Sequence, residues 1–298
     1  MNKKTNILIA GLVQHGCTNN PAQNLKTSIE GCREAASQGA QLLVLQELHG
    51  HAYFCQTENT DHFDLAEEIP GPTSQALGRF AKELGIVIVG SVFERRAAGI
   101  YHNTAIVLDS DGRLAGSYRK MHIPDDPGYC EKFYFTPGEG NFLPIDTSLG
   151  KLGVLICWDQ WYPEAARLMA MHGADVLIYP TAIGWDSRDE EVEQQRQRDS
   201  WITIQRAHAI ANGIPVISCN RVGFEPGPTD VTPGIHFWGS SFIAGPQGEM
   251  LQQLGMAEAG VCVSKLDLKH CEAVRRIWPF FRDRRIDAYG DLSKRYGK

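Results

Sequence analysis

The stretch that decides the fold runs Lys151-Leu-Gly-Val-Leu-Ile-Cys157-Trp158-Asp159. Its apolar residues have the pattern of a buried strand, and this strand delivers one cysteine to a turn. A helical pattern, Tyr162-Pro-Glu-Ala-Ala-Arg-Leu-Met, begins shortly after the turn. A strand, a turn that carries a reactive side chain and a helix together form a nucleophile elbow, here with a thiol.

Short apolar runs and helical patterns alternate along the rest of the chain. The helical patterns end at glycines or begin after Pro or Ser, and many of the apolar runs are rich in Val and Ile. Alternation of this kind predicts layers of helices and sheets rather than strands alone. Strands are predicted at 7–13, 42–45, 86–93, 103–108, 154–156, 176–179, 216–218, 241–244 and 260–266, and helices at 24–38, 74–84, 164–171 and 189–212.

Composition limits the class of protein. The chain has 298 residues, of which 43% are hydrophobic, and it contains no linker-like segment, so we expect one domain over 1–298. A net charge of -6 argues against nucleic-acid binding and favours a small-molecule substrate. The eight cysteines form no CxxC pair, which predicts reduced thiols and a cytoplasmic protein. No apolar run approaches the roughly 18 residues of a membrane span.

Two charged residues follow predicted strands in the same way as the cysteine does. Glu47 follows the run 42–45, and Lys120 follows a strand at 114–118. A thiol at neutral pH is only slightly ionised, so Cys157 requires a base or a positive environment to act as a nucleophile. A carboxylate, an ammonium group and a thiol are the groups that a cysteine enzyme cleaving amides requires.

In this order along the chain, the three segments resemble the nitrilase superfamily of carbon-nitrogen hydrolases, and the resemblance extends from about Ala10 to Arg285. It implies an α/β fold, a four-layer α-β-β-α sandwich. It also implies that Glu47 is the base, Cys157 the nucleophile and Lys120 the oxyanion donor, together with the N–H of Trp158. Glu131 matches a second glutamate that pairs with the lysine. The resemblance implies no cofactor and no metal.

Within the superfamily, the segments 121–129, 133–138, 157–164 and 179–184 resemble enzymes that hydrolyse N-carbamoylputrescine. That activity gives putrescine, carbon dioxide and ammonia, in polyamine biosynthesis. Gln160 and Trp161 stand where relatives acting on carboxylate-bearing substrates place arginine or histidine, so a carboxylate clamp is missing. The expected substrate is therefore a cationic ureide.

The acidic residues near 125 and 186 suit the ammonium end of such a substrate. We expect Asp186 to be its partner, with Asp125 nearby. Trp158, Trp185 and Tyr53 are expected to line its aliphatic stem. The same acidic run is also explained as a solvated helix start, where carboxylates favour the helix N-terminus.

Other interpretations remain open at this point. Within the superfamily, the alternatives are a β-ureidopropionase, an aliphatic amidase or a nitrilase, which differ in the charge of the substrate they prefer. A catalytically silent scaffold of the same fold predicts a broken site, yet all four residues are present. The pair His49-Gly-His51 beside Glu47 is a short hint of a metal site. A homo-oligomer is expected, in which the arginine-rich and aromatic tail 270–298 packs on a neighbouring subunit.

Overall fold

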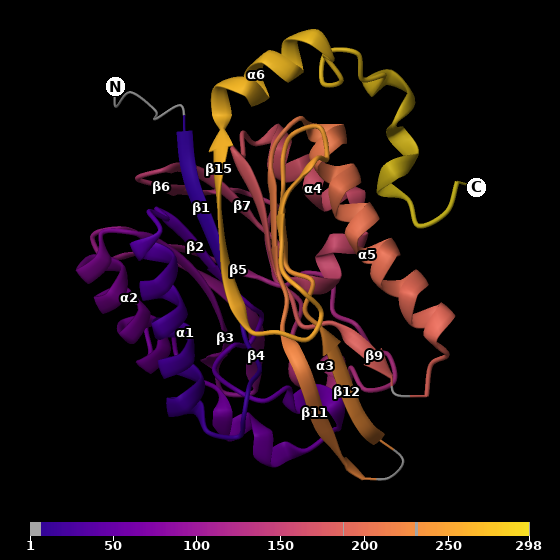
Figure 1. The fold of residues 1–298 in the computed structure, drawn as a ribbon. Helices are drawn as coiled ribbons and strands as arrows, with labels where there is room; N and C mark the ends of the chain where they lie inside the picture. Colours follow the sequence, from indigo (N-terminus) through magenta and orange to yellow (C-terminus); the bar gives the residue numbers. More distant parts are fainter. Residues whose placement is uncertain (1–6, 187, 230–231, 298) are drawn as a thin grey trace.

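The computed structural model describes residues 7–186, 188–229 and 232–297. Two six-stranded sheets lie face to face, and helices cover the outer face of each sheet (Figure 1). The order of layers is therefore α-β-β-α, which confirms the expected fold class. Each sheet is mixed, with parallel strand pairs at its centre and antiparallel pairs towards its edges.

The first sheet has the strand order β15-β1-β2-β3-β4-β5. Helices α1 and α2 pack on its outer face, where apolar side chains of both helices meet those of the strands. The bounds of these elements are β1 Ile7–Gln14, α1 Pro21–Ser37, β2 Leu42–Leu45, α2 Pro72–Leu84, β3 Val87–Ala97, β4 Ile100–Leu108, β5 Leu114–Arg119 and β15 Gly260–Asp267.

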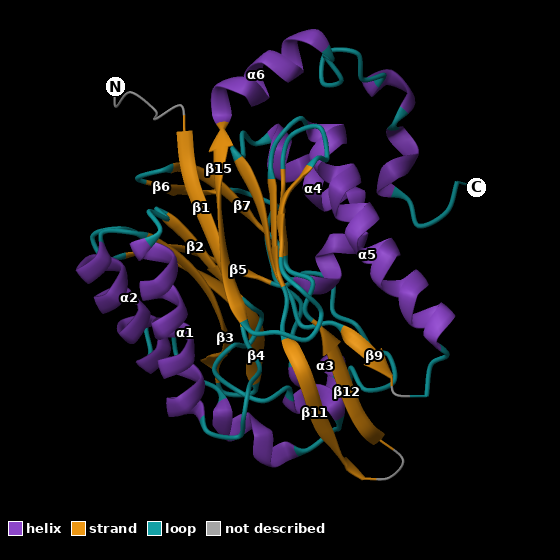
Figure 2. Cartoon of the chain, in the orientation of Figure 1, coloured by secondary structure: helices purple, strands orange, loops and turns teal. Residues whose placement is uncertain are grey.

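The second sheet has the strand order β14-β13-β10-β8-β7-β6. Helices α4 and α5 contact this sheet from the other side of the molecule (Figure 2). The bounds are β6 Ile145–Thr147, β7 Gly150–Val154, α4 Pro163–Met171, β8 Val176–Pro180, α5 Glu191–Asn212, β10 Val216–Cys219, β13 Phe242–Ala244 and β14 Met250–Gln253.

The main hydrophobic core fills the space between the two sheets. Alternate residues of β1 and β2, such as Leu8, Leu12 and Val44, face residues of β7 and β8 such as Val154. Both faces of the central strands are buried, which explains their nearly continuous apolar sequences. The core therefore holds the two sheets in a fixed relation, and the site between their strand ends inherits that rigidity.

Most predicted elements are confirmed, with shifted ends. Helices α1 and α2 begin at prolines, Pro21 and Pro72, because proline fits the first helical turn. Strand β7 ends at Val154 rather than continuing to 156. The backbone N–H of Ile156 is bonded instead to the Asp159 carboxylate at 2.9 Å, which turns the chain into the elbow.

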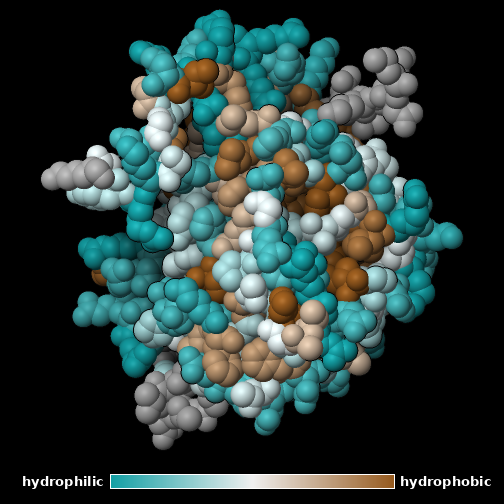
Figure 3. Space-filling view, turned by 180° about the vertical axis from the view of Figure 1, so that it is seen from behind, coloured by the Kyte–Doolittle hydropathy of each residue, from teal (hydrophilic) through white to brown (hydrophobic). Residues whose placement is uncertain are grey.

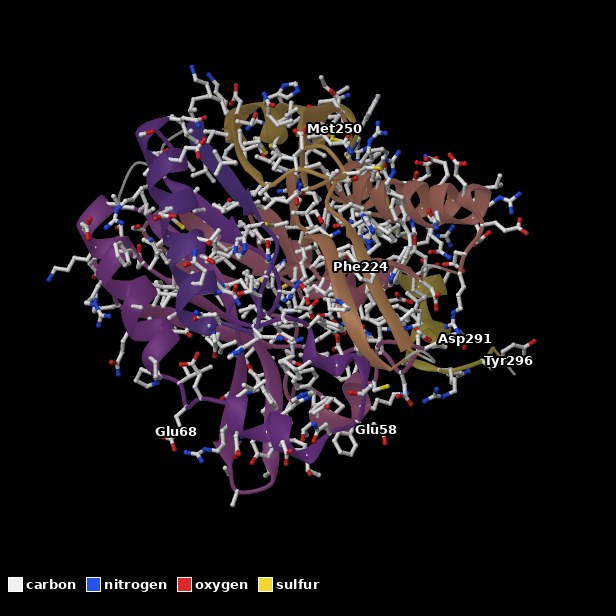
Figure 4. All side chains as sticks on the ribbon, turned by 60° about the horizontal axis from the view of Figure 1, so that its bottom comes forward. Glu58, Glu68, Phe224, Met250, Asp291 and Tyr296 are labelled. Carbon is white, nitrogen blue, oxygen red and sulfur yellow. The ribbon has the colours of Figure 1, made fainter. Side chains whose placement is uncertain are left out.

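A small third sheet was not predicted. Its strands are β9 Gly184–Asp186, β11 Val222–Thr229 and β12 Thr232–Trp238, in the order β11-β12-β9. The long hairpin of β11 and β12 projects from the body of the molecule (Figure 1), and Phe224 is labelled on it in Figure 4. Three prolines and three glycines in β11 and β12 hide the strand pattern in the sequence. The hairpin brings β9 to the edge of the candidate site.

The C-terminal segment begins with α6 Leu268–Ile277 and continues through η4 Ile286–Ala288 and η5 Gly290–Ser293. It arches over the end of the sheets towards α5 (Figure 1). The ring of Phe281 is covered by Arg167 at 4.7 Å and by Arg275 at 5.4 Å. The first part of the segment therefore packs on its own chain. Within the described ranges, no helix has the length and apolarity to cross a bilayer.

Candidate active site

Three charged or reactive residues meet where strands of the two sheets end. Glu47 lies two residues after β2, Lys120 directly follows β5, and Cys157 begins the short helix η3 Cys157–Trp161 after β7. Glu131 joins them from the first turn of α3 Glu131–Tyr134. Glu47, Lys120 and Glu131 are fully buried and Cys157 is 4% exposed. The four residues predicted to form one site are thus gathered in one place.

Lys120 lies between the two carboxylates. Its Nζ donates to Oε1 of Glu47 at 2.8 Å and to Oε2 of Glu131 at 2.7 Å. The adjacent carboxylates keep the pKa of Lys120 well above its ordinary value, although burial by itself acts in the opposite direction. An ammonium group has three N–H donors, so one donor remains after these two bonds. That donor can stabilise a negative oxygen in the pocket.

The two oxygens of the Glu47 carboxylate differ. Oε1 accepts from Lys120 and also from Nδ2 of Asn103, at 2.7 Å. Oε2 is buried and has no hydrogen-bond partner in the part of the chain that the structure describes. One oxygen is therefore fixed by two donors and the other is available to accept a proton.

Cys157 occupies a strained position. Its φ is 42°, a left-handed conformation that side chains other than glycine rarely adopt. Its Sγ lies 3.8 Å from the carbonyl oxygen of Ala182. Burial raises the pKa of the Cys157 thiol well above its ordinary value, Glu47 raises it further, and Lys120 opposes the shift. The sulfur therefore rests as a thiol, and its ionisation requires a base.

Asp159 fixes the turn that carries the cysteine. Its carboxylate accepts the N–H of Ile156 at 2.9 Å, the hydroxyl of Tyr118 at 2.8 Å and a hydrogen bond with His122 Nδ1 at 2.7 Å. Asp159 itself is fully buried. These bonds tie the turn in the second sheet to β5 in the first, just before Lys120. The link therefore holds the turn that carries the thiol against the end of β5.

Glu131 is held from the side away from Lys120. The hydroxyl of Tyr53 donates to its Oε1 at 2.7 Å. Burial raises the pKa of Glu131, and the nearby Glu47 carboxylate adds to the shift, while Lys120 opposes it. Glu131 is therefore held on both sides, by Tyr53 and by Lys120.

A cavity of about 540 Å³ opens above Cys157. This size suits a small metabolite. Aromatic rings and charged side chains line it, and most of the charged groups lie between β9 and the first turns of α5: Tyr129, Trp158, Trp161, Trp238, Asp126, Asp186, Arg188, Asp189, Glu193 and Arg196. Because Cys157 is almost fully buried, this cavity is the route by which a substrate reaches the sulfur.

The predicted substrate-binding residues divide into two groups. Trp158 and Asp186 line the cavity as expected. Asp125 is exposed and does not line it, whereas its neighbour Asp126 does. Pro124, Asp126 and Pro127 line the cavity and Asp125 does not, a difference between neighbours that the sequence could not reveal.

Tyr53 and Trp185 are corrections to the prediction, because neither lines the cavity. Tyr53 is bonded to Glu131 from behind and borders a separate cavity. The indole N–H of Trp185 donates to the Gln194 carbonyl at 2.8 Å, and its ring packs against Trp238. Each aromatic ring therefore supports the wall of the site from outside.

The predicted ammonium partner, Asp186, already has a partner within the chain. Arg188 donates two hydrogen bonds to its carboxylate from the guanidinium group, and a third comes from its backbone N–H. These bonds lower the pKa of Asp186 below its usual value. At the same rim, Arg196 lies 3.4 Å from Glu193. The mouth of the cavity therefore carries both signs of charge.

No cluster of three or more metal-binding side chains occurs among residues 7–186, 188–229 and 232–297. His49 belongs to the pair His49-Gly-His51, which suggested a metal site in the sequence. It is fully buried, and its ring and the ring of His15 both form a hydrogen bond with the Ser28 hydroxyl. Burial lowers the pKa of His49 to about 3. The two histidines form a neutral polar network beyond the ends of β1 and β2, beside α1.

Three residues around the site were missed by the sequence interpretation. Asn103 interrupts an apolar strand next to Thr104, and a polar residue in such a buried strand is the signal that could have found it. Asp159 was quoted without a role. Arg221 is fully buried and donates to the backbone carbonyls of Glu47 and Leu48, at 3.0 Å each. No local pattern links Arg221 to a strand end 174 residues away.

The sequence predicts that Gln160 replaces the arginine or histidine with which some relatives bind a substrate carboxylate. Its side chain points into the protein, where Oε1 accepts from Trp201 at 2.9 Å and Thr181 at 3.2 Å. Trp161 lines the cavity instead. The position next to the elbow therefore presents a ring to the substrate and no cation.

Comparison with known proteins adds independent findings. The family model described as carbon-nitrogen hydrolase matches residues 9–276. An N-carbamoylputrescine amidase from Solanum lycopersicum is 42% identical over 97% of this chain and 96% of its own length. A citrullinase from Francisella tularensis is 38% identical over 98% of this chain and 99% of its own length.

Solved structures agree with these matches. A carbon-nitrogen hydrolase from Helicobacter pylori G27 has 49% sequence identity and a TM-score of 0.95, covering 98% of this chain and 100% of that chain. A mutant amidase from Nesterenkonia sp. AN1, solved with the acetamide moiety of fluoroacetamide added to its active-site cysteine, has 27% identity and a TM-score of 0.72, covering 94% of each chain. Together with the four buried residues at the strand ends, these matches show that the chain belongs to the carbon-nitrogen hydrolase family.

Proposed function

We propose that the chain is an amidohydrolase that cleaves N-carbamoylputrescine to putrescine, carbon dioxide and ammonia, as a step of polyamine biosynthesis. The observation that carries the chemistry is the position of Lys120 between two buried carboxylates beside a thiol. The substrate follows from the relatives of that activity, which match at 42% identity over nearly the whole chain.

In the first half of the reaction, Oε2 of Glu47 takes the proton from the Cys157 thiol. The sulfur attacks the ureido carbon, and the negative charge that develops on the oxygen is stabilised by the third donor of Lys120 and by the N–H of Trp158. Trp158 lies in the first turn of η3, where N–H groups have no acceptor within the helix. One such donor is worth about 3 kcal/mol in the barrier.

The bond from the ureido carbon to the terminal nitrogen then breaks. Glu47 returns the proton to that nitrogen, so that ammonia leaves and an N-alkylcarbamoyl group remains on Cys157. In the second half, Glu47 takes a proton from water, which attacks the same carbon and releases the thiol. The product is an N-alkylcarbamic acid, which decomposes to carbon dioxide and putrescine. Glu131 holds Lys120 in place throughout.

The far end of the substrate reaches the charged mouth of the cavity. Asp126 lines the cavity and makes no side-chain hydrogen bond or ion pair within the described chain, so it can accept an alkylammonium group. Trp158, Trp161 and Trp238 offer apolar surface for the four-carbon stem. Asp186 can take part only if Arg188 is displaced or shared.

A ureide with a zwitterionic end is the second candidate. Arg188 and Arg196 line the same mouth as the carboxylates, and a cationic group there can bind a carboxylate. Citrulline combines a ureido group with an ammonium and a carboxylate, and one relative is a citrullinase. The mixed charge at the mouth is the observation that favours this alternative.

Ammonia release by the purified protein separates the candidates. N-carbamoylputrescine, citrulline, N-carbamoyl-β-alanine and an aliphatic nitrile are offered at equal concentration to the native chain and to Cys157→Ala. The proposal expects the highest kcat/KM for N-carbamoylputrescine, and complete dependence on Cys157. A preference for citrulline would replace the substrate and keep the chemistry. No Cys157-dependent turnover of any compound would contradict the proposal.

The chain is also proposed to act as a cytoplasmic homo-oligomer, consistent with its free cysteines. Its C-terminal segment exposes large apolar side chains, among them Ile286 at 75% and Tyr296 at 78%. Hydrophobic patches also lie on the back of the molecule (Figure 3). We propose that 270–298, apart from the residues around Phe281 that pack on their own chain, packs on a neighbouring subunit and that the chain forms a single domain. Light scattering gives the molar mass of the full chain and of a chain ending at residue 284, and a comparison of the two tests whether the C-terminal segment contributes to the oligomer.

A further inference from the structure

We propose that Asn103 is a positioning residue for the reaction. Its side-chain amide fixes one oxygen of Glu47, so that the other oxygen faces the Cys157 proton. The inference rests on the base role of Glu47 in the proposed function. It extends that function by assigning a residue to the orientation of the base.

The geometry around Glu47 carries this assignment. Nδ2 of Asn103 and Nζ of Lys120 both donate to Oε1, at 2.7 and 2.8 Å. Oε2 has no partner among the described residues and is fully buried. Rotation of the carboxylate would break two hydrogen bonds to a charged group that is fully buried, which is costly. The orientation of Glu47 is therefore unique.

Asn103 is itself held in one orientation. Its Oδ1 accepts from the hydroxyl of Ser91 at 3.3 Å, and Ser91 in turn accepts the N–H of Leu48 at 3.1 Å. The carbonyl oxygen of Asn103 also accepts the backbone N–H of Lys120 at 2.9 Å. The Oδ1 contact identifies the oxygen of the amide, so its nitrogen must face Glu47. One residue of β4 thus connects the base, the lysine and β3.

An amide suits this position better than a second cation. A cation would hold the carboxylate equally well but would make it a weaker base, since a nearby positive charge favours the ionised form. An apolar residue would leave a buried charge with one donor fewer. Asn103 supplies direction and removes less basicity than a second cation would. Lys120 supplies the only positive charge among the groups that bond to the Glu47 carboxylate within the described chain.

The test measures the reactivity of the thiol without any substrate. The rate of Cys157 alkylation by iodoacetamide is followed across pH for the native chain, Asn103→Leu and Asn103→Ala. We expect both variants to react roughly 10- to 100-fold more slowly, because a hydrogen bond to a charged group is worth that factor. The acidic limb of the profile should move to higher pH. With N-carbamoylputrescine, kcat should fall similarly while KM changes less than about twofold.

Asn212→Leu is the matched control. Asn212 is also a buried amide, 3% exposed, but it bonds within α5 through the His208 carbonyl. It should lose thermal stability and keep the alkylation profile. Equal profiles for Asn103→Ala and the native chain, in folded protein, would overturn the inference.

Glu47→Gln separates this inference from the function on which it rests. If Glu47→Gln slows alkylation and Asn103→Ala does not, only the positioning role fails. If Glu47→Gln itself leaves the alkylation profile unchanged, the base assignment in the proposed function fails as well.

Discussion

The buried end of the cavity, here called its floor, and the mouth of the cavity differ in how their charged residues are buried and paired. At the floor, Glu47, Lys120 and Glu131 are fully buried, and one cation satisfies two carboxylates. At the mouth, Arg188 and Arg196 have side chains 62% and 72% exposed, and each pairs with a carboxylate in contact with water. Charges at the floor interact strongly and charges at the mouth weakly, because water screens only the latter.

The difference indicates how chemistry and selectivity are divided. A buried ion network has one arrangement, and removal of one member leaves an uncompensated charge. An exposed pair can open, exchange partners and accept a substrate group. The floor is therefore expected to determine the reaction, whereas the mouth adjusts which ureides enter.

The largest effect is expected at the nucleophile. Cys157→Ala should reduce kcat at least about 10⁴-fold, because the covalent route is lost and only binding remains. Ammonia release from N-carbamoylputrescine is the measurement. Cys17→Ala, a half-buried thiol in another cavity, is the control and should retain nearly full activity. An equal loss of activity in both variants would mean that Cys157 has no specific role in the reaction.

Lys120→Met should affect activity and stability together. Loss of the oxyanion donor should lower kcat about 10²- to 10³-fold. The two buried carboxylates left behind should lower the free energy of unfolding by about 3–5 kcal/mol. Urea unfolding of Lys120→Met and of Lys120→Met/Glu131→Gln separates these effects. The second change should restore part of the stability and none of the activity, and full recovery of activity would contradict the account.

The buried histidines near the floor should make stability depend on pH. Burial lowers the pKa of His15 to about 4 and that of His49 to about 3. Both lie below the ordinary value, so the unfolded chain binds more protons as pH falls below about 6.5. Stability should then fall by about 1.4 kcal/mol per pH unit for each histidine until its folded pKa is reached.

Urea unfolding at several pH values checks this dependence. His49→Gln removes one of these buried groups and should reduce the slope below about pH 6.5. His270→Gln, at the exposed start of α6, is the control and should leave the slope unchanged. Stability that rises as pH falls through this range would refute the assignment of neutral buried histidines.

The smallest effect is expected at the mouth. Asp186→Asn and Arg188→Gln should leave kcat within about twofold and change KM less than about tenfold, because exposed pairs contribute about 0.2–1 kcal/mol. Arg188→Gln should lower KM for a cationic ureide, since an internal competitor for Asp186 is removed. Steady-state kinetics at low and high salt measures this. A large fall in kcat would show that the residues at the mouth also take part in the reaction, which contradicts the division of roles.

The same division explains what the sequence could predict. Glu47, Lys120 and Cys157 each follow a strand, so strand patterns and the resemblance were enough to group them. The two-sheet fold follows from the same runs of apolar residues. Tyr53 and Trp185 were misplaced because an aromatic residue near a site can lie on either side of its wall. The Asp186 pair with Arg188 depends on a turn that sequence does not determine.

The covalent step is the most direct test of the account. Native protein mixed with N-carbamoylputrescine is quenched in acid, and the peptide containing Cys157 is analysed by mass spectrometry. The account predicts an adduct on Cys157 that retains the four-carbon diamine, because ammonia leaves first. It also predicts no adduct in Cys157→Ala. Turnover with an adduct on another residue, or with no adduct under conditions where hydrolysis is slowed, would contradict it.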